Sequence, residues 1–294
     1  MLGDFVGVAE FAVDAHVVGR LRGGALKCGD GFGKILGARV GDAEQIKGRP
    51  LRVRIRGGAL KHGHSLRVLL GVDERLTVER ERADAERSFN AAIKADPKNT
   101  PALFYLGRIA YEQKNWDSAI AMFNRATTAD AHLADAWKFL TLAYINRGAA
   151  ATDAKADADY LNAVRASEGL VRAKPADVGA LALNGQALIY AKQYAQAVPV
   201  LERATANANA QGPTLYLLGI AYSRTKNFPK AIATFERAAA KTPDDANVYR
   251  ELGYAYEVSK QYAKALAAYQ KGSTLAPDDA DLKQSVERVR PFAK

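Results

Sequence analysis

The sequence is poor in the residues that most often build catalytic and metal sites. It has one cysteine, Cys28, and four histidines, three of which lie before residue 85. From residue 85 onward there is no cysteine, and His132 is the single histidine. This composition leaves that segment without disulfides and with almost no scope for a metal cluster or a nucleophile–base pair.

The sequence also lacks a hydrophobic run long enough to span a membrane, and it shows no secretory signal pattern. Its formal net charge is +10, but acidic and basic residues are mixed and no run of lysine or arginine is present. Nucleic-acid binding is therefore the least favoured function.

What the sequence does contain is a period of 34 residues. The clearest markers are the pairs Leu106-Gly107, Asn184-Gly185, Leu218-Gly219 and Leu252-Gly253, and Leu140-Thr141 follows the first pair by one period. Within a period, one apolar set at helical spacing, such as Leu215, Leu218 and Tyr222, precedes a second set, such as Ala231, Phe235 and Ala238. Two such sets per period predict a stack of helical hairpins, which offers a binding surface more readily than an active site.

These residues resemble the tetratricopeptide repeat (TPR) family. The pattern is most complete in residues 246–279, which carry Tyr249, Leu252, Gly253, Tyr256, Ala265, Tyr269, Gly272 and Pro277. The resemblance implies an all-α fold, an α-solenoid of stacked TPR helical hairpins. The implied domains are the second helix of a truncated repeat (85–98), repeats at 99–132, 133–177, 178–211, 212–245 and 246–279, and a capping helix (280–294).

The repeat at 133–177 is irregular, because it ends at Pro175, about ten residues later than the period predicts. The extra residues lie within 145–159. Their alanines permit a helix extension and Gly148 favours a break, so we expect a longer second helix after a flexible turn. A tolerated surface insertion is the simpler explanation, and an element that contacts a partner is the alternative.

Residues 1–84 have a different character and hold 15 of the 24 glycines. The sequence Arg-Gly-Gly-Ala-Leu-Lys occurs at 22–27 and again 34 residues later, without a helical pattern around it. The codons of residue n and residue 262 − n can be reverse complements in all of the 84 pairs except Ala15/Asn247 and His16/Ala246, and the pair Met1/Gln261 requires TTG or CTG as the initiation codon. We interpret residues 1–84 as the opposite strand of the DNA that encodes 178–261, produced either by a wrongly joined sequence or by a genuine inverted duplication.

Opposite-strand translation turns core leucines into charged or amide residues and alanines into glycine or arginine. We therefore expect residues 1–84 to be a spurious or disordered, non-TPR segment. The glycine-rich loop at 29–34, which lacks the P-loop spacing, and the possible ligands Cys28, His62 and His64 then carry no function. On this interpretation the native N-terminus is missing, and no localisation is predicted.

In TPR proteins the first helices of successive hairpins line a concave groove. Transferring the groove positions of the family gives Phe104, Arg108, Tyr111, Lys138, Leu142, Ile145, Gln186, Ile189, Tyr216, Ile220, Arg224, Arg250, Tyr254 and Glu257. Aromatic residues and arginine often dominate binding, although packing between helices explains each position equally well. The Lys/Asn clamp of some members needs asparagine at Arg108, Leu142 and Gln186, so a helical or extended peptide is favoured over a C-terminal carboxylate.

The function expected from the resemblance is protein–protein interaction as a scaffold or adaptor, with a protein or peptide partner. No catalytic residue, cofactor or metal is expected. The first alternative is a non-catalytic subunit that recruits substrates or glycans to an enzyme or to an envelope or secretion assembly. An enzyme with its own active site ranks below it, and the oligomeric state is not predicted.

Overall fold

The structure, a computed structural model, describes residues 74–151, 154–206 and 210–293. It separates into two units, Met1–Leu76 and Thr77–Lys294, and the second unit contains almost all of the described residues. Residues 1–73, for which disorder was expected, lie outside the described part.

The described residues form α-helices and one short 3₁₀ helix. In chain order these are α3 (Glu74–Ala95), α4 (Thr100–Glu112), α5 (Trp116–Ala129), α6 (Ala134–Ala150), α7 (Ala154–Ala173), α8 (Val178–Tyr190), α9 (Tyr194–Ala204), α10 (Gly212–Arg224), α11 (Phe228–Lys241), α12 (Ala246–Val258), α13 (Tyr262–Leu275), α14 (Ala280–Val289) and η1 (Arg290–Phe292).

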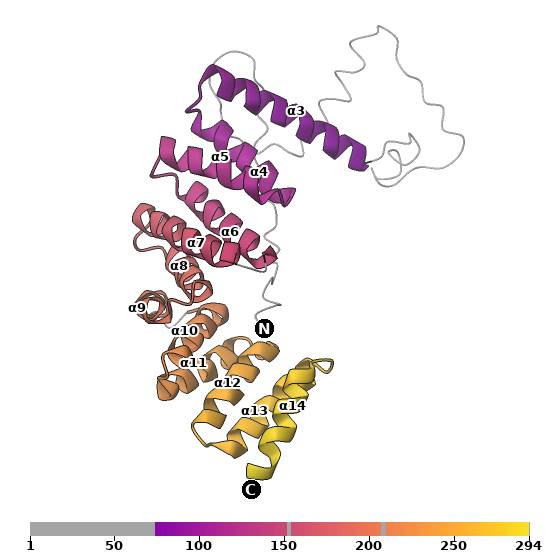
Figure 1. Cartoon of the computed structure of the whole chain (residues 1–294), viewed down its shortest axis with the longest axis vertical. Coiled ribbons are helices and arrows are strands. Elements are labelled where there is room, and N and C mark those ends of the chain that lie inside the picture. The colour runs from indigo at the N-terminus through magenta and orange to yellow at the C-terminus, as the bar shows by residue number, and fades with distance from the viewer. Residues whose placement is uncertain (1–73, 152–153, 207–209, 294) are drawn as a thin grey trace, which may run out of the picture. The chain divides into compact units, whose positions relative to one another are not determined.

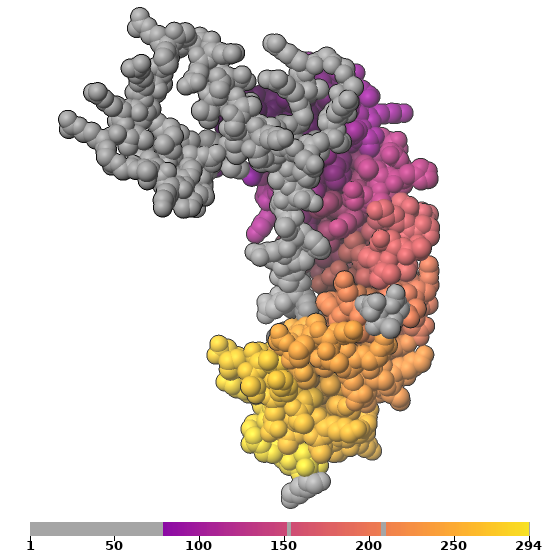
Figure 2. Space-filling view, turned by 180° about the vertical axis from the view of Figure 1, so that it is seen from behind, coloured from indigo at the N-terminus to yellow at the C-terminus, as the bar shows by residue number. Residues whose placement is uncertain are grey.

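The helices pair into hairpins, α4/α5 through α12/α13, and α14 packs against α13 at the end (Figure 1). Each hairpin touches its neighbours in the chain, so the colours of Figure 2 follow one another in sequence order. The predicted all-α solenoid is confirmed. The first helices of successive hairpins also contact one another, whereas no two successive second helices do so to a similar extent among the described residues. The first helices therefore lie on the inner side of the stack.

A glycine on the first helix allows the two helices of a hairpin to approach closely. A Cβ atom added at Gly107, Gly219 or Gly253 would lie less than 3.0 Å from the ring of Phe123, Phe235 or Tyr269, respectively. Leu201 takes the place of the ring opposite Gly185. A glycine inside a helix costs about 1 kcal/mol relative to alanine, and the buried ring that it admits offsets this cost.

Within four hairpins, the turn places a lysine in the left-handed backbone region. These are Lys114, Lys192, Lys226 and Lys260, with φ between 58° and 63°. Arg80 and Gly148 stand at the same position of the period, but they lie inside α3 and α6. The chain therefore does not reverse at these two places as it does in the other hairpins.

The prediction that Gly148 breaks a helix is wrong. Helix α6 continues to Ala150, and both helices of this hairpin are long, with 17 residues in α6 and 20 in α7. A Cβ atom at Gly148 would lie 2.9 Å from the Tyr160 ring. This glycine therefore allows α7 to pack closely on α6, and the insertion lengthens both helices rather than the second alone.

Helix α3 crosses residue 84, where the opposite-strand segment was expected to end. It starts at Glu74 and runs through 22 residues without interruption. Residues 74–84 contain no glycine or proline and are rich in glutamate and arginine, which favour helix. The local sequence therefore continues the helix across the expected boundary, whatever its origin.

Candidate functional site

The candidate site is the inner face of the stack, formed by the first helices α4, α6, α8, α10 and α12. All predicted groove residues lie on these helices. The structure brings them together in two groups, one on α4 and α6 and the other on α10 and α12, and the residues of α8 lie between the two.

The group on α4 and α6 is centred on Phe139, which the sequence prediction missed. The Phe104 and Tyr111 rings lie 6.0 and 5.4 Å from the Phe139 ring. The Arg108 guanidinium sits 4.2 Å above the centre of the same ring and also pairs with Glu112 at 3.3 Å. These three predicted groove residues therefore pack between helices, as the structural alternative anticipated.

The remaining predicted residues of the middle hairpins differ in exposure. Ile145 and Ile189 are buried and belong to the core rather than to an open surface. Leu142 and Gln186 are partly buried, and the Lys138 ammonium lies 5.9 Å from the Phe139 ring. This part of the inner face thus offers few exposed apolar side chains.

On α10 and α12 the predicted residues form a polar network. The Arg224 guanidinium lies 3.6 Å from the Glu251 carboxylate. Arg250 pairs with Asp279 of the capping region and donates a hydrogen bond of 2.9 Å to the Asn247 side chain.

Glu257 of α12 is bound by side chains of the two helices that follow, α13 and α14. It accepts hydrogen bonds from Arg288 at 2.9 and 3.0 Å and from the Tyr269 hydroxyl at 2.7 Å. The bonds from Arg288, followed by that from Tyr269, lower the pKa of the Glu257 carboxyl. These bonds connect the capping helix α14 to α12, the first helix of the last hairpin. The Glu257 carboxylate therefore has a structural role.

Burial raises the pKa of two other groups in this network. It raises the pKa of the Glu251 carboxyl, although Arg224 and Arg250 act in the opposite direction. It also raises the pKa of the Tyr216 hydroxyl, and the negative charge of Glu251 adds to this effect. Tyr216 is only 8% exposed, so its ring serves the core more than the surface, while the neighbouring Ile220 is partly buried.

Four buried side-chain atoms in the described residues have no hydrogen-bond partner, and all four lie on first helices. They are Arg108 Nε, Ser223 Oγ, Arg250 Nε and Glu251 Oε2. Helix α12, which carries two of them, also exposes two apolar side chains, Tyr254 at 40% and Val258 at 43%. Unsatisfied polar atoms next to exposed apolar groups make the α10/α12 face the part of the inner surface best suited to a ligand.

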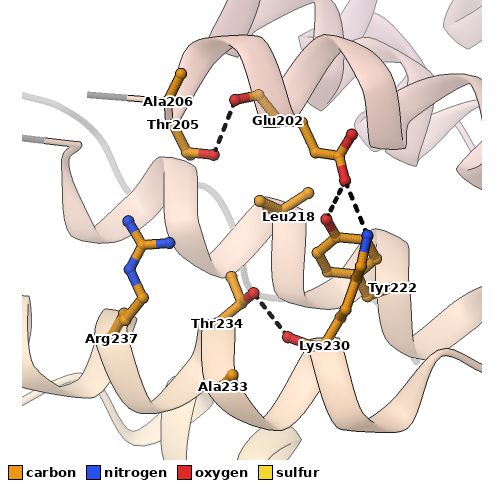
Figure 3. Close-up of a pocket in the computed structure, with 9 residues that line it drawn as sticks. All are labelled: Glu202, Thr205, Ala206, Leu218, Tyr222, Lys230, Ala233, Thr234 and Arg237. Atoms are coloured by element: carbon orange, nitrogen blue, oxygen red, sulfur yellow. Dashed lines mark hydrogen bonds and ion pairs between the residues drawn. The ribbon is translucent and has the colours of Figure 1, made fainter. Parts of the chain in front are cut away.

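A shallow pocket of about 370 Å³ lies away from the predicted groove, where α9, α10 and α11 meet (Figure 3). The Glu202 carboxylate accepts hydrogen bonds from the Tyr222 hydroxyl and from Lys230, whereas Arg237 stands at the other end. The pocket follows from the early end of α9 at Ala204, which the repeat pattern did not reveal.

The contacts of this pocket recur at the next interface. Glu236, Tyr256 and Lys264 repeat the arrangement of Glu202, Tyr222 and Lys230 one period later. A related bond of 3.3 Å joins Asn124 to the Tyr144 hydroxyl. These repeated contacts connect successive hairpins, so we assign the carboxylates and tyrosines to structure.

Among the described residues, no group of three or more histidine, cysteine, aspartate or glutamate side chains is placed to hold a metal ion. No helix in that part of the chain combines the length and apolarity needed to cross a bilayer.

Together, the hairpin stack and its inner face define a helical-repeat protein of the kind that presents a surface to other proteins. The tetratricopeptide repeat family model matches residues 76–134 and 216–280. These two segments of the chain are tetratricopeptide repeats, as the resemblance on Leu252, Gly253 and their equivalents predicted. A search of curated protein sequences finds no match.

Solved structures show the same fold. YrrB, described as a TPR protein with an unusual peptide-binding site, is 18% identical to this chain, with a TM-score of 0.56. The match covers 68% of this chain and 97% of YrrB. MamA from Desulfovibrio magneticus RS-1 is 21% identical, with a TM-score of 0.54. The match covers 62% of this chain and 97% of the MamA chain. At such identities the likeness concerns the fold, and this fold supports a role as a protein-interaction scaffold.

Proposed function

We propose that the chain is a scaffold that binds a peptide or helix of a partner protein on its inner face, chiefly at α10 and α12. The observation that carries the proposal is the pair Tyr254 and Val258, exposed on the same helix as the unpartnered atoms of Arg250 and Glu251. An apolar side chain of the partner would rest on the exposed pair, because such contacts supply most of the affinity of peptide grooves.

The polar atoms would add specificity. Arg250 Nε lacks an acceptor, and Glu251 Oε2 lacks a donor. A peptide group offers both a carbonyl and an N–H, so a bound backbone can satisfy the two atoms after a small side-chain adjustment. The peptide-binding site in the description of YrrB is consistent with this assignment, which involves no catalytic step.

The proposal is tested by selecting peptides from a displayed random library on the full chain and measuring their affinity for variants. Tyr254→Ala and Val258→Ala are each expected to weaken binding by about tenfold or more. Leu161→Ala is the matched control, because Leu161 is 43% exposed, as Val258 is, but lies on the second helix α7. Tyr216 is unsuitable for this test, because its buried ring supports the fold.

Selected peptides that bind Tyr254→Ala and Val258→Ala as tightly as the parent chain would overturn the assignment. So would peptides whose affinity depends on Leu161 instead. Thermal melts of the variants separate a loss of binding from a loss of folding.

A further inference from the structure

Arg224 is the single charged residue of α10, and it differs from the other arginines of the first helices. The other three, Arg108, Arg147 and Arg250, each donate a hydrogen bond to a carboxylate of the protein. The carboxylate nearest to Arg224 is that of Glu251, and the 3.6 Å between them is too long for a hydrogen bond. In the part of the chain that the structure describes, the donors of this guanidinium therefore have no acceptor.

The position of Arg224 connects it with the apolar pair of the proposed binding site. Arg224 precedes Val258 by 34 residues, which is one full period, so the two stand at equivalent positions of α10 and α12. The Arg224 side chain is 38% exposed, whereas the side chain of its ion-pair partner Glu251 is only 17% exposed. The guanidinium is therefore accessible to a ligand that already contacts Val258, while Glu251 lies deeper.

The chemistry of a guanidinium indicates what such a ligand would offer. Arginine carries five N–H donors in a planar fork, and a carboxylate can accept two of them side by side, whereas a peptide carbonyl has a single oxygen. The positive charges of Arg224 and Arg250 both act on Glu251, so a second carboxylate would meet two cations beside the one buried anion. Because Asp279 pairs with Arg250, the preference would arise from the open hydrogen bonds of Arg224 more than from net charge.

We propose that Arg224 selects partner segments that contain an aspartate or a glutamate. The carboxylate of this residue binds the Arg224 guanidinium, while an apolar residue of the same segment rests on Tyr254 and Val258. The inference rests on the proposed function and adds the chemistry of the partner. Arg224 is thus a specificity-determining residue of the α10/α12 face.

The geometry of the stack also limits the spacing of the two residues in the partner. Neighbouring packed helices lie about 10 Å apart, which is the expected separation of equivalent positions on α10 and α12. An extended chain rises by about 3.3 Å per residue and a helix by about 1.5 Å. The acidic and the apolar residue should therefore be about three positions apart in an extended segment and about seven apart in a helical one.

The test uses peptides selected on the full chain from the displayed random library, limited to those whose binding depends on Tyr254 and Val258. An aspartate or glutamate is expected at the stated spacing from the apolar residue. Changing this acid to its amide should weaken binding to the parent chain by about tenfold, because the amide keeps one acceptor oxygen but loses the charge and the second acceptor. In Arg224→Gln, the acid and amide peptides should bind equally well.

Two further variants serve as controls. Arg224→Lys keeps the charge but not the fork, so it should retain only part of the preference for the acid. Arg172→Gln removes the same charge from an exposed position of the second helix α7, and it should retain the full preference. Because the measured quantity is the ratio of two peptide affinities for one variant, a general loss of stability does not imitate the expected result.

The possible outcomes separate this inference from the proposed function. A preference for the acid that vanishes in Arg224→Gln and persists in Arg172→Gln supports the inference. Peptides that need Tyr254 and Val258 but contain no acidic residue overturn the inference alone, as does a preference that is unchanged in Arg224→Gln. Peptides that bind independently of Tyr254 and Val258, or a selection that yields no peptide, overturn the proposed function and the inference with it.

Discussion

Arg147 shows how one side chain can hold an irregular hairpin. Its guanidinium binds Asp159 through two hydrogen bonds, one of them 2.8 Å long from Nε, and it also pairs with Asp117 of α5. Asp159 is 2% exposed, so its charge depends on this partner. The bonds to Asp159, more than the smaller effect of Asp117, raise the pKa of Arg147, so its guanidinium stays protonated.

Arg147→Ala should therefore destabilise the protein strongly. Removing one partner of a buried ion pair costs about 3–5 kcal/mol, because the other charge remains buried without compensation. The exposed pair Lys192–Asp157, at 3.4 Å, provides the control, and Lys192→Ala should change stability by less than about 1 kcal/mol. Urea denaturation followed by circular dichroism measures both, and equal effects of the two variants would contradict this role of Arg147.

At the residue scale, the sequence predicted which positions are small and which are large, but not every partner. Asn184 departed from the leucine of the repeat pattern without an explanation. The structure provides one, because its buried amide donates a hydrogen bond of 2.8 Å to the Ser167 hydroxyl of α7. Phe139 was missed because the family positions point to its neighbour Lys138, although its one-period offset from Tyr105 was visible in the sequence.

At the scale of the element, hairpin geometry depends on the glycine of each first helix. Alanine favours helix over glycine by about 1 kcal/mol, so Gly219→Ala would stabilise an isolated α10. In the folded hairpin, however, the new methyl group meets the fully buried Phe235 ring. We expect a net destabilisation of about 1–3 kcal/mol, which is typical of overpacking.

Thermal melting of Gly219→Ala tests this balance. Ala233→Gly provides the reverse case, because Ala233 is exposed on α11 and its loss changes helix propensity alone. A higher melting temperature for Gly219→Ala would show that close approach of α10 and α11 does not require glycine.

The elements were predictable where the period is regular, because hairpin positions follow from the spacing of small and apolar residues. They were not predictable at the insertion, where the role of Gly148 depends on the Tyr160 ring across the hairpin. They also failed at the start of α3, where local helix propensity continues through residues that the codon argument assigns to another origin.

At the scale of the whole molecule, the interpretation of residues 1–84 has a direct test. Codons 1–84 should be the reverse complement of codons 178–261, with TTG or CTG as the initiation codon and single-base changes at Ala15/Asn247 and His16/Ala246. The nucleotide sequence decides this, and mismatches spread along the segment would end the interpretation. Amplification of genomic DNA across codons 84 and 85 then separates a wrongly joined sequence from a genuine inverted duplication.

The residues of the candidate site were predicted only in part from the sequence. The family positions placed Tyr254 and Arg250 on the inner face, as they lie in the structure, but could not distinguish exposed groups from packed ones. Exposure depends on the neighbouring hairpin, and Tyr111 is occupied because Asn146 of the next repeat donates a hydrogen bond to it.

The repeated contacts at the hairpin interfaces have a consequence for how such a chain changes length. Glu202, Tyr222 and Lys230 join α9 to α10 and α11, and one period later the bond from Tyr256 to Glu236 joins α12 to α11. Loss or duplication of residues 212–245 in a recombination event would therefore bring matching surfaces together. The gene can gain or lose a whole hairpin without having to evolve a new junction, provided that the cut preserves the period.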